Sequence, residues 1–239
     1  VKYPFFQFGP RYAAATGETL VEGYRKLGKG VLITYYVLNF ATMFTIQAAV
    51  TMVTASLASQ LFGFHDTLNL VDWSILLMII SILILVLGKY KLLDNLMKYI
   101  ITILTISTIL ALGVALFTTK EAFDVTQIIP SGKIEITFLI AFLGWMPAPL
   151  DVSIWHSIWS IEKDKTSFIK TKRKDAIFDF NIGYISALCL GLCFLLLGAL
   201  VMYKSGETFS DKGTLFASQL INLYTKNLGE FSYIFIAIA

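Results

Sequence analysis

Two prolines near the centre of a long apolar stretch constrain this chain more than any other feature. The stretch runs from about residue 134 to 159 and contains Pro147 and Pro149. A helix needs roughly 20 apolar residues to cross the hydrocarbon core of a membrane, and this stretch is long enough. Proline lacks an N–H, so Pro147 leaves the Leu143 carbonyl without its helical donor, and Pro149 does the same to Trp145. The sequence therefore predicts a helix that breaks in mid-span.

Composition indicates that the surroundings of this stretch are lipid. Hydrophobic residues make up 56% of the chain and charged residues only 15%, against roughly 25% charged in soluble domains. The mean hydropathy is +0.73. Cys189 and Cys193 lie four residues apart in an apolar run, where we interpret them as reduced packing residues. We expect an integral membrane protein with the lipid bilayer as its environment and no nucleic-acid partner.

Apolar segments divide the chain into five complete spans and part of a sixth. The chain has no initiator Met or targeting signal at its start, and the last segment stops at Ala239. We therefore expect one transmembrane domain, residues 1–239, truncated at both ends. The predicted spans are about 31–62, 73–87, 97–117, 134–159, 176–203 and, in part, 231–239.

Lysine and arginine residues alternate between the predicted loops. Five of the 19 lie in 1–30, three in 88–98 and six in 160–176, while the intervening loops hold fewer. Because positive residues accumulate on the cytoplasmic side, we predict that these three loops are cytoplasmic. The net charge of +3 then needs no acidic partner. We expect the membrane to be the inner, or plasma, membrane of a bacterium.

Several short motifs of the chain are similar to those of one family. The motifs nearest the start are Lys-Tyr-Pro-Phe-Phe at 2–6, Phe-Gly-Pro-Arg-Tyr at 8–12, Ala-Thr-Gly-Glu-Thr-Leu at 15–20 and Glu-Gly-Tyr-Arg at 22–25. The likeness continues in Leu-Phe-Gly at 61–63, in Met146-Pro147 of the broken span, and in Asp-Phe-Asn at 179–181. With these motifs the chain resembles the Nramp family of divalent-metal transporters.

This resemblance implies a LeuT-type inverted-repeat fold, with the chain running from the end of helix 2 to the start of helix 8. The family binds its metal between broken helices 1 and 6, with an Asp and an Asn from helix 1. Helix 6 supplies a Met sulfur, which corresponds to Met146, and a carbonyl, which corresponds to Leu143. The resemblance implies a divalent ion such as manganese or iron as substrate, with no resident cofactor. Helix 1 lies outside these residues.

Met146 and Asp151 each have a second interpretation. A thioether is a soft ligand that suits manganese, iron or cadmium better than magnesium or calcium, but methionine also fills gaps in packed helices. An ionisable residue at membrane depth usually faces a cavity or a partner, so Asp151 is a candidate metal or proton group. Asp151 could equally cap the half-helix that restarts after Pro149. The sequence leaves both pairs of alternatives open.

Proton coupling is where the sequence departs most from the family it resembles. The family usually has His after Met-Pro, and this chain has Ala148. His156 lies about three residues beyond the family's second His, and we keep it as a candidate for the proton path. Gln47 and Val50 stand where the family's third helix usually carries Asp and Glu. Metal could therefore move without proton coupling, or with coupling through Asp151 or through helices outside the chain.

Other functions remain as alternatives. A magnesium transporter related to Nramp proteins is one, although Met146 favours a softer ion. A transporter of an organic solute such as an amino acid is another, because one fold serves many substrates. We expect no enzyme, since Ser153, His156 and Ser157 do not form a convincing catalytic set. The missing upstream helix would discriminate between these transporters. A break like Asp-Pro-Gly-Asn in that helix implies a metal substrate, whereas a glycine-rich break without carboxylates implies an organic substrate.

Overall fold

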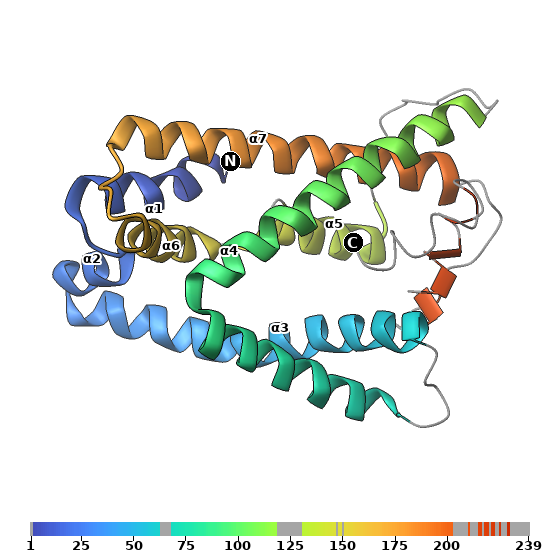
Figure 1. Ribbon diagram of the computed structural model, residues 1–239, viewed down its shortest axis with the longest axis horizontal. Helices are drawn as coiled ribbons and strands as arrows, with labels where there is room; N and C mark the ends of the chain where they lie inside the picture. Colours follow the sequence, from blue (N-terminus) through green and yellow to red (C-terminus); the bar gives the residue numbers. More distant parts are fainter. Residues whose placement is uncertain are drawn as a thin grey trace. The chain divides into compact units, whose positions relative to one another are not determined.

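The computed structural model describes residues 2–62, 68–118, 131–146, 148–149 and 151–202, with short pieces between 210 and 229. All regular structure in these residues is helical, as the sequence predicts (Figure 1). The elements are α1 (Tyr3–Thr16), α2 (Leu20–Leu27), α3 (Lys29–Phe62), α4 (Leu70–Thr118), α5 (Lys133–Trp145), α6 (Val152–Ser167), α7 (Arg173–Leu197) and a π-helical turn, η1 (Gly198–Met202).

Four helical segments of the described residues are long and apolar enough to cross a membrane, so the protein is an integral membrane protein. Their apolar side chains are mostly exposed, as lipid-facing side chains are. The segments correspond to the predicted spans 31–62, 73–87, 97–117 and 176–203, although residue 203 and the partial span 231–239 lie outside the described residues. They are Lys29–Phe62, Leu70–Gly88, Tyr90–Phe117 and Arg173–Leu200.

The predicted loop 88–98 is wrong, because α4 is helical without interruption over 49 residues. The ribbon bends near the middle of α4 instead of opening into a loop (Figure 1). Residues 88–98 contain no proline and mostly good helix formers, so the backbone has no reason to leave the helix. Within residues 88–98 the Lys98 ammonium and the Asp94 carboxylate form an i,i+4 ion pair at 2.5 Å, which is typical of a helix.

The predicted loops 1–30 and 160–176 are also largely helical. The first contains α1 and α2, and α6 continues to Ser167 in the second. A capping box starts α2: the Thr19 hydroxyl accepts from the Glu22 N–H at 3.4 Å, and the Glu22 carboxylate accepts from the Thr19 N–H at 2.6 Å. The Thr19 N–H lowers the pKa of the Glu22 carboxyl, because it binds the charged form. The basic residues of these segments thus lie mainly on helices.

The chain forms two units, and each is considered by itself. One consists of residues 1–39 and 121–191, and the other of residues 40–120 and 192–239. In the second unit small residues allow helices to approach closely: Ala55 and Ala58 pack against Trp73, and Ala111 and Ala115 pack against Leu197. The residues placed below at the helix break and on α1 belong to the first unit.

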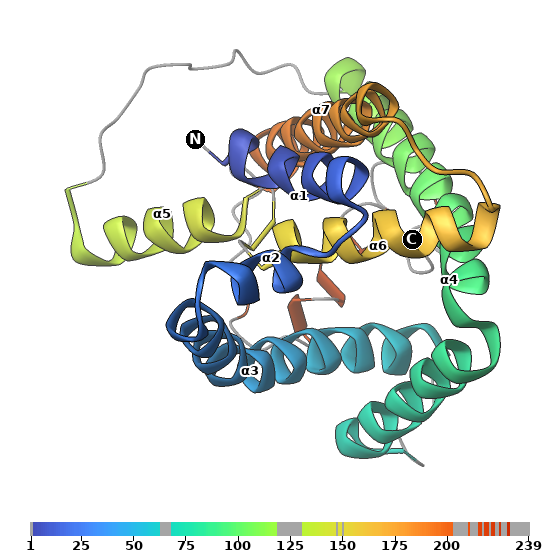
Figure 2. The ribbon, with the colours of Figure 1, turned by 90° about the vertical axis from the view of Figure 1, so that its left-hand side faces the viewer.

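In the first unit α1 lies beside α6 and α7 (Figures 1 and 2). Phe6 is only 1% exposed, and its ring contacts His156 of α6 and Tyr184 of α7 at centroid distances of 6.3 and 6.2 Å. Gly9 lies against the Ser153 carbonyl so closely that a Cβ at this position would be 2.2 Å from the oxygen. The contact between α1 and α6 therefore requires glycine at position 9.

We predict that Gly9→Ala destabilises the protein, because a backbone carbonyl cannot retreat from the added methyl group without moving α6. The melting temperature of the purified protein should fall, as measured by fluorescence-detected size exclusion after heating. Gly183→Ala is the matched control: Gly183 is helical in α7, and a Cβ there meets nothing within 4 Å. The control should be neutral or stabilising by up to about 1 kcal/mol. Equal melting temperatures for the two variants would contradict the close contact.

Candidate functional site at the helix break

The helix is interrupted in the stretch where the sequence predicts a break. α5 ends at Trp145 and α6 starts at Val152, and the two half-helices follow one another in roughly the same direction (Figure 2). Met146 is extended, with φ −88° and ψ 132°, while its N–H still donates to the Phe142 carbonyl at 2.9 Å. The Pro149 carbonyl accepts from the Val152 N–H at 3.2 Å, where α6 begins. Pro147 lies outside the described residues.

A cation directly before α1 bonds to the break. The Lys2 ammonium donates to the Gly144 carbonyl at 2.6 Å and to the Ala148 carbonyl at 3.0 Å, so it bridges the two sides of the extended Met146. Sequence reasoning missed this role and counted Lys2 among the cations of a loop. A lysine set directly before the apolar run Tyr-Pro-Phe-Phe was the signal available. Leu143, the predicted carbonyl ligand, lies in the last turn of α5, one residue before Gly144.

Met146 packs against α7. A Cβ built on Gly191 would lie 2.8 Å from the methyl carbon of Met146 and 3.9 Å from its sulfur. The thioether therefore occupies the space that glycine leaves on α7, which is how methionine fills gaps between helices. This contact also fixes where the sulfur lies. The ligand role predicted for the same sulfur stays a prediction.

Asp151 is the residue at which α6 begins, but its carboxylate does not cap the helix. Its backbone is already helical, with φ −61° and ψ −26°, whereas a capping side chain normally needs an extended residue. Its carbonyl accepts from the N–H groups of Ile154 and Trp155 at 2.9 and 3.4 Å. The side-chain capping interpretation is thus wrong, and the metal or proton role of Asp151 stays a prediction.

His156 lies among aromatic rings. Its imidazole meets Phe6, Trp159 and Phe180 edge to face, at centroid distances of 6.3, 5.9 and 5.7 Å. These three rings come from α1, α6 and α7, so His156 lies where the three helices meet. The surroundings suit a packed aromatic residue, and the proton role predicted for His156 is not tested by them.

A polar group that sequence reasoning missed joins α1 to α7. The Tyr3 hydroxyl donates to the Asn181 amide oxygen at 2.6 Å, and the Gln7 amide nitrogen donates to the Tyr3 hydroxyl at 2.7 Å. Tyr3 and Gln7 are four residues apart and share one face of α1, which was the signal available in the sequence. Asn181 entered the sequence argument only as part of a motif. The group fixes the start of α1, where Lys2 also lies.

The hydroxyl of Ser157 is used for packing. Ser157 is fully buried; its hydroxyl oxygen accepts from the Leu20 N–H at 3.0 Å, and its O–H donates to the Ile154 carbonyl at 2.6 Å. This pair of bonds fastens the start of α2 to α6. The Ser153 carbonyl meanwhile lies against Gly9. The geometry therefore gives Ser157 a structural role at this helix contact.

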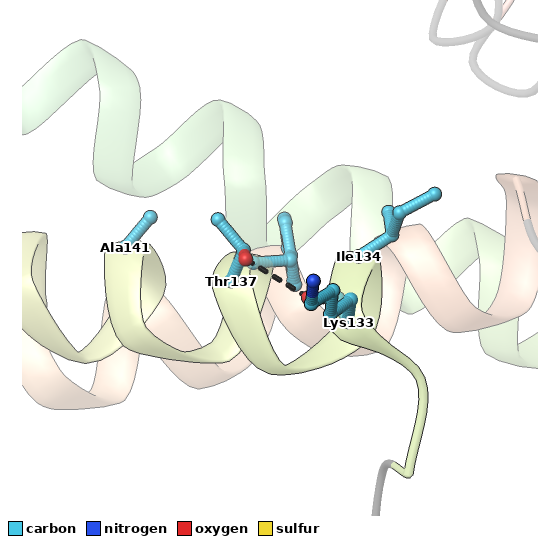
Figure 3. A pocket seen from close by; sticks show the side chains of 5 residues that line it. Lys133, Ile134, Thr137 and Ala141 are labelled. Carbon is cyan, nitrogen blue, oxygen red and sulfur yellow. Dashed lines mark hydrogen bonds between the residues drawn. The ribbon is translucent and has the colours of Figure 1, made fainter.

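The described residues hold no group of three or more His, Cys, Asp or Glu side chains that could bind a metal ion. Cys189 and Cys193 are free thiols, as the sequence predicts. An open hollow of about 540 Å³ lies instead along one face of α5 (Figure 3). The predicted site residues do not line it. Its lining consists of Lys133, Ile134, Thr137, Phe138 and Ala141.

Comparisons with known proteins add one relative. Uncharacterized protein PM0681 of Pasteurella multocida (strain Pm70) is 39% identical over 236 residues. The match covers 97% of this chain and 53% of the relative, so the chain spans about half the length of the curated relative it matches. No family model matches the chain, and no solved structure matches it. The name of the relative assigns no activity.

We predict that Tyr3 and Asn181 are energetically coupled. A double-mutant cycle with Tyr3→Phe and Asn181→Ala should give a coupling free energy of about 0.5–1.5 kcal/mol, the usual contribution of one hydrogen bond. Unfolding free energies of the purified protein provide the measurement. Tyr99→Phe, at a hydroxyl-bearing ring 72% exposed on α4, is the comparison and should give a coupling near zero. Additive effects of Tyr3→Phe and Asn181→Ala would contradict the bond.

Proposed function

We propose that this protein is a secondary transporter that imports divalent transition-metal ions such as manganese or iron, and that its fold is a LeuT-type inverted repeat. We place it in a bacterial inner membrane with residues 1–30, 88–98 and 160–176 on the cytoplasmic side. The observation that carries the proposal is the interruption between α5 and α6, with the extended Met146 at its start. Coupling to protons is proposed to be weak or to depend on Asp151, and the oligomeric state is left open.

The break favours transport because of its backbone groups. Hydrocarbon offers no hydrogen-bond partners, so non-helical backbone at membrane depth occurs where it is buried in protein or lines a wet cavity. Transporters place substrate and ion sites at such broken helices. A protein that only needed a long apolar helix would have no use for two prolines in this stretch.

The donors at the break favour a soft divalent ion. Met146 offers a thioether, and the carbonyl of Leu143 has no helical donor because residue 147 is proline. Asp151 adds a carboxylate at the start of α6. The resemblance to Nramp proteins implies that an Asp and an Asn from a preceding helix complete the ligand set.

One observation favours a second candidate, a transporter of an organic solute that bears a carboxylate, such as an amino acid. The Lys2 ammonium places a positive charge at the break, and charged donors bind carboxylates strongly. A magnesium transporter related to Nramp proteins is the remaining alternative, but the thioether contributes little to the binding of so hard an ion.

We predict that Met146→Ala changes ion selectivity. The KM for uptake of manganese and cadmium into proteoliposomes should rise about tenfold or more. Loss of even an outer partner of a metal site lowers metal affinity or activity by that factor. Magnesium and calcium uptake should change less. The matched control is Met78→Ala, at a methionine 44% exposed on α4. Unchanged cadmium uptake and ion preference in Met146→Ala would remove the sulfur from the site.

We predict that proton coupling is weak or depends on Asp151. At the positions where Nramp proteins usually carry titratable side chains, this chain has Ala148, Gln47 and Val50. Asp151 is then the carboxylate next to the break. Metal-driven acidification of proteoliposomes, followed with an internal pH dye, should therefore be small, or should disappear in Asp151→Asn. Strong acidification that survives Asp151→Asn would place the proton route on other helices.

A further inference from the structure

The ammonium of Lys2 occupies a site made of backbone oxygens. One oxygen belongs to Gly144, at the end of α5, and the other to Ala148, in the extended segment beyond it. Both are neutral carbonyls, and the two bonds of 2.6 and 3.0 Å have the geometry of good hydrogen bonds. Gly144 and Ala148 are more than 140 residues from Lys2 in the sequence, so the contact is built by the fold of this unit.

The chemistry of these oxygens attracts cations. The last four carbonyls of a helix have no intrahelical donor, and the helix dipole adds partial negative charge at this end. Gly144 is one of those four in α5. Transporters with broken helices bind sodium ions or protons through half-helix C-terminal ends and unwound carbonyls. Lys2 therefore lies where a free monovalent cation is bound in proteins with a similar break.

The ammonium reaches this site from a fixed backbone. The Lys2 carbonyl accepts from the N–H groups of Phe5 and Phe6 at 3.0 and 3.1 Å, in the first turn of α1. Phe6 is buried against α6 and α7, and the neighbouring Tyr3 is bonded to Asn181 of α7. A lysine ammonium has three donors, and two of them are used at the break. Because the ammonium is tethered to this fixed backbone, its effective concentration at the two carbonyls is high.

We propose that the carbonyls of Gly144 and Ala148 form a monovalent-cation site that the protein fills with its own Lys2 ammonium. The tethered ammonium takes the place of a sodium or potassium ion and makes the folded break independent of both. Shortening the Lys2 side chain opens the site to a small free cation. This proposal does not rest on the identity of the transported substrate, because it concerns only which cation binds the two carbonyls at the break.

The test is the thermal stability of the purified whole protein in detergent. Melting temperatures are measured in choline, sodium, potassium and methylammonium chloride at equal ionic strength, for the parent, Lys2→Ala and Lys2→Met. The parent should melt at the same temperature in all four salts. Lys2→Ala should melt lower in choline chloride and recover with sodium, potassium or methylammonium, to a plateau as their concentration rises.

The Lys2→Met variant distinguishes two effects of removing Lys2: the loss of the positive charge and the opening of the site to a free cation. Methionine fills the space of the lysine stem without a charge, so this variant should melt low in all four salts. Lys29→Ala, at an exposed lysine at the start of α3, is the control and should behave like the parent. If Lys2→Ala does not fold in choline chloride, purification in methylammonium or potassium chloride should recover it.

Three results would overturn the proposal. The first is a Lys2→Ala protein whose stability is the same in choline as in the small cations. The second is a saturable sodium or potassium effect of equal size in the parent and in Lys2→Ala, which would place the cation elsewhere. The third is a Lys2→Ala protein that no small cation recovers. Because none of these measurements involves transport, failure here is distinguishable from failure of the proposed function.

Discussion

The structure of the first unit depends on one constraint: backbone carbonyls that lose their helical donors at the break between α5 and α6 must find other partners. If the break lies at membrane depth, as proposed above, water cannot supply these partners, and an unsatisfied polar group in hydrocarbon costs several kcal/mol. The chain meets the constraint in two ways. The Pro149 carbonyl is used at the first turn of α6, and the Lys2 ammonium binds the carbonyls of Gly144 and Ala148. The second solution requires α1 to lie beside the break.

The placement of α1 explains several residues that otherwise have no evident role. Gly9 removes a side chain so that α1 can lie against the Ser153 carbonyl, and Phe6 fills the space between α6 and α7. Tyr3 fixes the rotation of α1 through Asn181. Together these contacts bring Lys2 to the break. A small residue, a buried ring and a polar anchor on one short helix therefore position a single charge.

Features set by local chemistry could be predicted from the sequence, and features set by distant contacts could not. The interruption at Met146 follows from prolines that lack donors, and the four apolar spans follow from composition. The loop expected at 88–98 was wrong because charge alone does not stop a helix that has no breaker. Lys2 was missed because its partners lie in a different part of the sequence. The capping role of Asp151 failed on a backbone angle that no pattern reveals.

The charges beside the break limit what can bind there. The Lys2 ammonium lies at the C-terminal end of α5, and Asp151 lies at the N-terminal end of α6. Each charge is therefore opposite in sign to the partial charge of the helix end beside it, which is favourable. Their formal charges cancel. A divalent ion bound beside Met146 is repelled by the Lys2 ammonium, because like charges that lie close together raise each other's energy. A transition metal at Met146 therefore needs carboxylates beyond Asp151, and the helix that the Nramp resemblance implies would have to bring them. A zwitterionic solute needs none, because one ammonium and one carboxylate already match its two charges.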